Sequence, residues 1–479
     1  MRAALALWLG TIVISAGCSS KYPETTSSAS DVTAPQFDLN TLAGKNASLR
    51  ATADPEIRFS ATVEAAGDGD TDADHAGLND GVIDAPPSLQ PNPVALDGTS
   101  IAAPAVTVNL DKGAAPQNET SIAVDPGNPN RLVASANDYV TGTWSCFIAP
   151  GMPCSAIADG YSGTYFSNDG GKTWCCNSSD PAHIGTLIPG VQRLTGGQYD
   201  AGGDPAVAFD SRGNVYYAGL GFNRLSAPNT VAVNRGTFDA SGHLSWGAPT
   251  FIGQTNAPAI IDDKEWIAAD ANASSPFRDR VYVTFTRFIF NPAKGNYVQS
   301  PIMAAVSSDG GQTFSEPQII GAPAIYSQGS RPAVAPDGTV YVFFDGFIRN
   351  TPFRAIYVTK STDGGQSFGP PVKVADRRGI GGIRNTLFRV NSFPAAAVAP
   401  DGTIYASWSA NYLDSATTYG PEGFCSTTAP IVGCHSVAVL SKSTDGGSAW
   451  SAPAPFNAAV DAQNRTPIGT YTGTGITPN

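Results

Sequence analysis

The chain has 479 residues, a formal net charge of −12 and a pI near 4.7. An acidic chain lacks the concentrated basic face that phosphate binding needs, so nucleic acid is excluded as a partner. After the N-terminus, no stretch of about 20 apolar residues could span a bilayer. Scattered histidines without ligand spacing argue against a histidine-based metal site or catalytic triad: His75, His183, His243 and His435.

The first residues have the features of an export signal, which we assign to residues 1–17. Arg2 supplies a positive end, residues 3–14 form an apolar segment of signal-peptide length, and small residues precede a cleavage site. The next residue is Cys18, and a junction of two small residues and a cysteine resembles a bacterial lipobox, in which the cysteine is acylated. Because Ser15 stands where a lipobox usually has leucine, ordinary signal cleavage is the alternative.

This signal predicts an exported cell-envelope lipoprotein that touches the membrane only through its lipid anchor. Ser19 follows the cysteine, which favours the outer membrane or the cell surface; a periplasmic or secreted protein is the alternative. Residues 18–100 are rich in Ser, Thr, Ala, Asp and Pro without sustained apolar periodicity. Such a segment cannot bury enough apolar surface to fold, so we predict a disordered tether.

Within the tether, alternate carboxylates between residues 70 and 84 could converge on calcium, which takes about six to eight oxygen ligands. The segment resembles the calcium repeat of thrombospondin type 3 modules, but His75 and Ala76 are inserted before the glycine and break the register. A solvated acidic linker is therefore the favoured alternative, and no other cofactor is expected. The candidate ligands are Asp70, Asp72, Asp74 and Asp80.

From residue 101 the chain is predicted to be all-β, because short segments rich in Val, Tyr and Phe alternate with turn signals. One unit recurs five times: an apolar strand, an Asp or Asp-Gly turn and a second strand. Asp-Gly suits a two-residue hairpin turn because it tolerates positive φ. The copies span residues 121–134, 205–217, 266–283, 332–342 and 394–405.

A second unit alternates with these hairpins and contains Ser-x-Asp-Gly-Gly before an aromatic residue. A hairpin, a strand, this turn and a further strand make a four-stranded blade, and radial repetition of such blades is a propeller. A decayed copy of the turn lies at residues 238–246. The four full copies, which we call the Asp turns, are residues 167–174, 307–314, 361–368 and 443–450.

The pattern of the Asp turns resembles the Asp box, or BNR repeat, of the sialidase-like superfamily. The four copies with their hairpins cover residues 115–456, most of the folded region. The resemblance implies a β-propeller over residues 101–479, and we expect six blades. The sixth would join the C-terminal tail to residues 105–110; a five-bladed ring or a truncated chain is the alternative.

The aspartates of the Asp turns are predicted to be structural rather than catalytic, because each can accept backbone N–H bonds inside its own turn. In an up-and-down blade these turns share one face with the hairpin turns. A ligand is therefore expected on the opposite face, among the residues just before each first strand and in the loops after each second strand. The residues expected there include Asp200, Asp262, Lys264 and Glu265. The structural aspartates are Asp169, Asp309, Asp363 and Asp445.

Six cysteines besides Cys18 predict disulfides, because an exported protein meets an oxidising environment. Cys425 and Cys434 are the simplest pair, since both lie in one short segment. The other four allow several connectivities: Cys146, Cys154, Cys175 and Cys176.

On the expected ligand face, the candidate catalytic carboxylates are Glu119, Asp204 and Asp263. The candidate substrate contacts are arginines, because guanidinium forks suit carboxylated or sulfated ligands. They are Arg331, Arg384 and Arg389.

The resemblance implies glycan binding, but the Arg-Ile-Pro signature that opens the first sialidase blade is missing, and the first blade here begins Gln117-Asn-Glu119. An exo-α-sialidase-like glycoside hydrolase is therefore only one interpretation. We predict a propeller that binds a glycan or anionic carbohydrate and, if the site is catalytic, hydrolyses it. A non-catalytic adhesion or protein-interaction scaffold is the alternative, and the sequence specifies no oligomeric state.

Overall fold

The structure is a computed structural model that describes residue 108 and residues 117–138, 147–149, 152–153, 161–174, 188–223, 228–351, 353–377, 392–413 and 434–455. The predicted signal, Cys18, the tether and its calcium ligands lie outside these ranges, as do Arg384 and Arg389. Of the predicted disulfide cysteines, the described ranges include only Cys434. No helix in these ranges has the length and apolar character that crossing a membrane requires.

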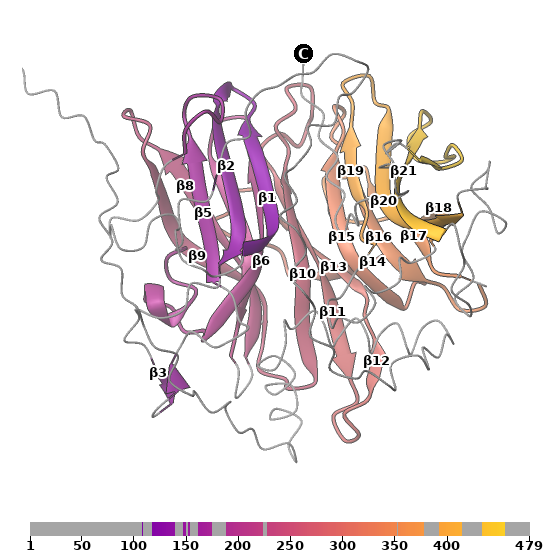
Figure 1. The fold of residues 1–479 in the computed structure, drawn as a ribbon, viewed down its shortest axis with the longest axis horizontal. Helices are drawn as coiled ribbons and strands as arrows, with labels where there is room; N and C mark the ends of the chain where they lie inside the picture. Colours follow the sequence, from indigo (N-terminus) through magenta and orange to yellow (C-terminus); the bar gives the residue numbers. More distant parts are fainter. Residues whose placement is uncertain are drawn as a thin grey trace, which may run out of the picture.

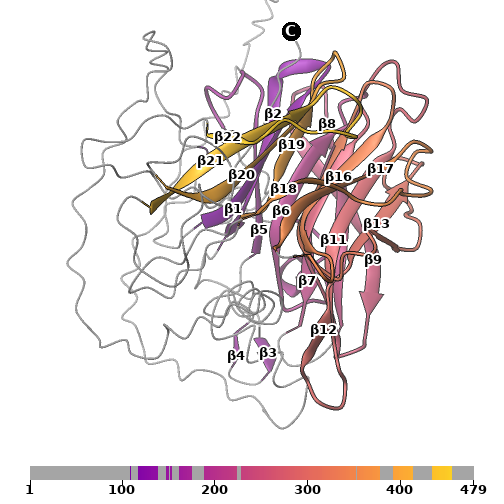
Figure 2. The same cartoon turned by 90° about the vertical axis from the view of Figure 1, so that its right-hand side faces the viewer.

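The all-β prediction is confirmed, because the described residues form five antiparallel sheets arranged as the blades of a propeller (Figures 1 and 2). Blade 1 contains β1 (Gln117–Asp125), β2 (Asn128–Asp138) and β5 (Tyr161–Ser167). Blade 2 contains β6 (Ala201–Phe209), β7 (Val215–Phe222), β8 (Asn229–Phe238) and β9 (Leu244–Thr255). Blade 3 contains β10 (Ile260–Ala269), β11 (Val281–Phe290), β13 (Ile302–Ser307) and β14 (Gln318–Ile320), and β12 (Tyr297–Gln299) pairs with β11.

Blade 4 contains β15 (Tyr326–Val334), β16 (Val340–Phe347), β17 (Ala355–Ser361) and β18 (Val372–Asp376). Blade 5 contains β19 (Ala395–Val398), β20 (Ile404–Leu413), β21 (Cys434–Ser443) and β22 (Ala454–Pro455). A separate short hairpin joins β3 (Phe147–Ala149) to β4 (Met152–Pro153), and one short 3-10 helix, η2, spans Arg193–Thr195.

The blade count differs from the six that we expected, since the described part of the chain contains five blades. Apart from Val108, the segments that a sixth blade would need, residues 105–110 and the tail after residue 455, lie outside the described residues. The predicted order within a blade is confirmed. In each of blades 2 to 5 the hairpin comes first, and the Asp turn, or its decayed copy in blade 2, joins the last two strands of the sheet.

The hydrophobic core lies between the blades. Phe285 of blade 3 packs in one cluster with Val231 of blade 2, and Phe343 of blade 4 packs in another with Trp408 of blade 5. All four side chains are fully buried, and each large one contributes roughly 1.5–3 kcal/mol to stability. In blades 2 to 5, the aromatic residue that ends the turn packs against the cluster that its blade shares with the preceding blade: Trp246, Phe314, Phe368 and Trp450.

The Asp turns share one hydrogen-bond pattern, which blade 3 illustrates. The Ser307 hydroxyl donates to Asp309 Oδ1 at 2.8 Å, and the Thr313 backbone N–H and hydroxyl donate to the same carboxylate at 3.0 and 2.6 Å. Gly310 and Gly311 have left-handed φ values of 73° and 80°, which only glycine adopts at little cost. The same Ser–Asp bond occurs in the other three turns, at Asp169, Asp363 and Asp445.

Asp363 provides a test of this structural role. The Ser367 hydroxyl is the main cause that lowers the pKa of Asp363 from 3.8 to about 2. The ionised carboxylate therefore stabilises the fold fully above pH 3.8, and this contribution is lost as the pH falls towards 2. Asp363→Asn should lower the thermal midpoint clearly at about pH 6 and little near pH 2, measured by circular dichroism, provided that the wild type is still folded there.

Glu316→Gln, which changes an exposed carboxylate close to another Asp turn, is the control. Equal losses of stability for Asp363→Asn at both pH values would contradict the proposed hydrogen-bond role of the ionised carboxylate.

Candidate functional site at the propeller axis

The first strands of the blades contact one another in succession, so they line the propeller axis. Four of them carry a β-bulge at the same position. The bulged residue has a left-handed backbone in each: Glu119 (φ 52°), Asp204 (φ 54°), Lys264 (φ 51°) and Gly329 (φ 67°). Phe393 holds the corresponding position of blade 5. Ala335 and Ala399 begin the equivalent hairpin turns of blades 4 and 5, and Gly329 and Phe393 each stand six positions before them.

The bulges bring three charged side chains together, which we call the axial triad: Glu119, Asp204 and Lys264. The Lys264 ammonium lies 2.9 Å from Glu119 Oε2 and 3.8 Å from Asp204 Oδ2. The three side chains are only 12%, 5% and 8% exposed, for Lys264, Glu119 and Asp204 respectively. Asn137 of blade 1 helps to hold the position of blade 2, because its Oδ1 accepts the Asp204 backbone N–H at 2.8 Å.

Phe393 packs beside the triad. Its ring centre lies 5.9 Å from the Lys264 ammonium. A side chain on Gly329 would collide with the Phe393 ring, so blade 4 has room only for glycine at the bulge. All five blades therefore place one residue at this level of the axis.

Glu265, next to the triad, is a buried carboxyl group. The residue is 2% exposed, and no other described residue donates a hydrogen bond to either of its side-chain oxygens. Burial raises its pKa well above 4.5, and the charges of Asp263 and Glu119 add to the rise. The backbone N–H of Glu265 itself and the charge of Lys264 oppose it. The physical consequence is a carboxyl group that stays protonated at pH values where exposed glutamates are ionised.

Two of the three predicted catalytic carboxylates, Glu119 and Asp204, meet at the axis. The third, Asp263, is 4% exposed and accepts the Lys264 backbone N–H at 2.8 Å, so it lies against the triad. The expectation that these residues precede the first strands is wrong, because β1, β6 and β10 begin before them. Each first strand pairs with the second strand on both sides of its bulge, so it begins earlier in the chain than we predicted.

Arg331 lies apart from the triad. It follows the bulge of β15, and its guanidinium carbon sits 3.2 Å from the centre of the Trp266 ring. Burial lowers its pKa to about 9, and within the described ranges it forms no ion pair. The structure therefore does not bring this predicted substrate contact to Glu119 or Asp204.

Two further acids that we expected on the ligand face are held by arginines. Asp262 accepts two bonds from Arg287 at 2.7 and 2.8 Å, and this pairing raises the pKa of Arg287. Asp200 accepts a bond from Arg193 at 2.7 Å. No group of three His, Cys, Asp or Glu residues within the described ranges is placed to hold a metal ion.

Sequence reasoning placed Lys264 and Glu265 on the ligand face without assigning either a role, and it did not single out Phe393. The sequence does contain a spacing that marks the bulged positions. In blades 1 to 3, the bulged residue stands six positions before an aspartate that ends the first strand or follows it. These aspartates are Asp125, Asp210 and Asp270.

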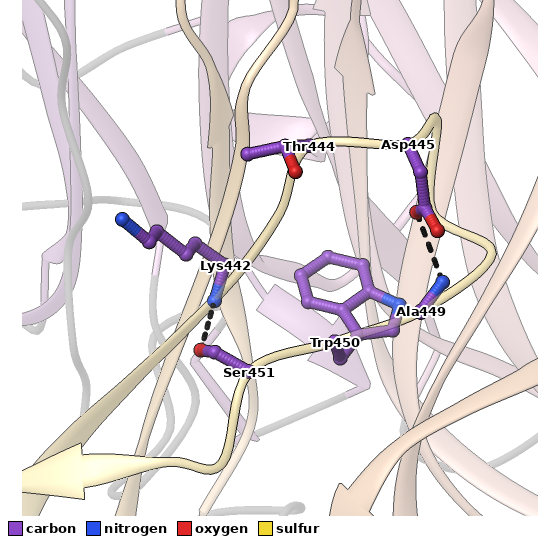
Figure 3. A pocket seen from close by; sticks show the side chains of 6 residues that line it. All are labelled: Lys442, Thr444, Asp445, Ala449, Trp450 and Ser451. Atoms are coloured by element: carbon purple, nitrogen blue, oxygen red, sulfur yellow. Dashed lines mark hydrogen bonds between the residues drawn. The ribbon is translucent and has the colours of Figure 1, made fainter.

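A hollow of about 240 Å³ lies at the last Asp turn, at the opposite end of the blade from the bulges (Figure 3). The Ala449 N–H and the Lys442 N–H both bond within its wall, to Asp445 at 2.9 Å and to Ser451 at 3.0 Å. The Trp450 ring forms another part of it. Since Asp445 is used by its own turn, the axial triad is the better candidate site.

No protein-family model matches the chain, and no curated protein matches it. Solved structures with a similar fold include the Hadza microbial sialidase Hz136, at 14% identity and a TM-score of 0.41 over 71% of this chain and 58% of that one, less than two thirds of its length. The α-L-arabinanase of Penicillium chrysogenum, solved with arabinobiose, is 13% identical, with a TM-score of 0.40 over 70% of this chain and 80% of that one. The NanB sialidase from Streptococcus pneumoniae is 12% identical, with a TM-score of 0.39 over 75% and 62%. At such values, the function has to be argued from the site itself.

Proposed function

We propose that the chain binds a glycan at the axial triad and hydrolyses a glycosidic bond there, with Glu265 as the proton donor. The observation that carries this proposal is the buried carboxyl group of Glu265, to which no other described residue donates a hydrogen bond, next to the ion pair of Lys264 and Glu119. Glycoside hydrolysis generally needs one protonated carboxyl group and one ionised carboxylate, kept apart in pKa by their environments. Glu119, bonded to Lys264, is the candidate for the ionised partner.

The test is a glycan array followed by a hydrolysis screen on the purified mature chain. Binding and release of reducing ends, with release abolished by Glu265→Gln, would support the proposal. Binding without any release from the wild type would overturn the hydrolytic part. That outcome would favour the second candidate, a non-catalytic binding scaffold, which is suggested by the ion pairs that already join Lys264 to Glu119 and Asp204.

We further propose that the protein is exported and anchored through an acylated Cys18, on the basis of the small residues before this cysteine. Cys18→Ser should move the protein from the membrane fraction to the soluble fraction and remove labelling by a palmitate analogue. A wild-type protein that is already soluble and unlabelled would contradict the anchor.

A further inference from the structure

We propose that the axial triad binds neighbouring hydroxyl groups of an uncharged sugar unit. The inference narrows the proposed function, on which it rests, because it chooses between a neutral and an anionic glycan at this site. It depends on three observations: the backbone strain at the triad, the ion pairs that its members already form, and the position of the cation Arg331 apart from it.

The backbone of the triad is left-handed, and it is strained at two of the three residues. Glu119, Asp204 and Lys264 all have φ values between 51° and 54°. L-residues other than asparagine and aspartate rarely enter this region, so the strain falls on Glu119 and Lys264. Blade 4 has glycine at the same position, so the bulge itself needs no charged side chain. Strain of this kind collects at functional sites, where the surrounding structure holds it in place. The strained positions therefore point to a role for the charges beyond forming the bulge.

The chemistry of the triad suits hydroxyl groups. A carboxylate accepts hydrogen bonds and an ammonium donates them, and here the two kinds of group lie 2.9 and 3.8 Å apart. A sugar hydroxyl both donates and accepts, so adjacent hydroxyls can bond to a carboxylate and to Lys264 together. The sugar needs no net charge to form these hydrogen bonds.

An anionic sugar is disfavoured at the same place. The Lys264 ammonium is already bonded to Glu119 and lies 3.8 Å from Asp204 Oδ2, so a sugar carboxylate would meet like charges. Like charges placed together select against the wrong ligand. Arg331, a cation that forms no ion pair within the described ranges, lies on Trp266 rather than at the triad.

The first experiment compares matched oligosaccharides by calorimetry: a neutral glycan, and the same glycan with its primary hydroxyls oxidised to carboxylates. We expect the neutral form to bind at least about tenfold more tightly, and Glu119→Gln and Asp204→Asn to weaken its binding about tenfold or more. Glu316→Gln is the matched control. Salt should change the affinity for the neutral form little.

Tighter binding of the oxidised form, weakened by salt, would overturn the inference and leave the proposed function standing. Absence of binding to any glycan on the array would overturn both.

A second measurement separates recognition from a purely structural role. The triple variant Glu119→Gly, Asp204→Gly, Lys264→Gly removes all three charges together and relieves the left-handed strain. We expect a thermal midpoint equal to or above that of the wild type, with binding of the neutral glycan lost. A midpoint several degrees lower would show that the triad stabilises the fold, and would overturn the inference.

Discussion

Glu265→Gln should reduce hydrolysis by about 10²- to 10⁴-fold, the usual contribution of a general acid, while glycan binding and the fold are retained. Glutamine keeps the size of the side chain but has no proton to give to a leaving oxygen. The measurement is kcat for the best substrate of the hydrolysis screen, together with the dissociation constant. The exposed Glu316→Gln is the matched control. A variant that hydrolyses at the wild-type rate would remove Glu265 from the mechanism.

The pH dependence of stability gives a second, substrate-independent signature of Glu265. Its folded pKa lies well above 4.5, so between these values the folded chain holds a proton that the unfolded chain releases. The stability contributed by this proton is complete below pH 4.5 and is lost as the pH rises through the folded pKa. Relative to the wild type, Glu265→Gln should therefore gain thermal stability over the range in which the pH rises from 4.5 through the folded pKa. A constant difference across that range would contradict the buried neutral carboxyl group.

Asp345→Ala should destabilise the protein by about 3–5 kcal/mol, the cost of leaving a buried charge without its partner. Asp345 is 2% exposed and accepts bonds from Arg354 at 3.1 Å and Arg377 at 3.2 Å, whose side chains are 3% and 5% exposed. The carboxylate thus links β16 to the residue before β17 and to the residue after β18. Urea denaturation monitored by tryptophan fluorescence measures the loss.

The control for Asp345 is an ion pair on the surface of the same blade. Lys373 and Asp376 lie 2.9 Å apart, but their side chains are 53% and 39% exposed. Asp376→Ala should therefore cost no more than about 1 kcal/mol, because water screens the pair. If both variants lost the same stability, burial would not be what makes the Asp345 cluster important.

The repeat pattern was enough to predict the propeller. Turn chemistry is local: in Ser307-Ser-Asp-Gly-Gly, the aspartate bonds to N–H and hydroxyl groups of its own turn, and the glycines allow left-handed angles. The short sequence pattern is therefore enough to predict the turn. The decayed copy in blade 2 behaves in the same way, since Asp239 accepts the Ser241 and His243 N–H groups at 2.8 and 3.0 Å. The repeat pattern did not predict the number of blades, because the closure of a ring depends on contacts between segments far apart in the chain.

The sequence by itself determined the all-β class, the order of strands within a blade and the face on which to look for a ligand, because these follow from local turns and from alternation along a strand. Only the tertiary structure decided that Lys264 joins Glu119 and Asp204, residues of three different blades, and that Arg331 stacks on Trp266 instead. The reason is physical: a β-bulge turns one side chain toward the axis, but which charges meet there depends on how the blades pack around it.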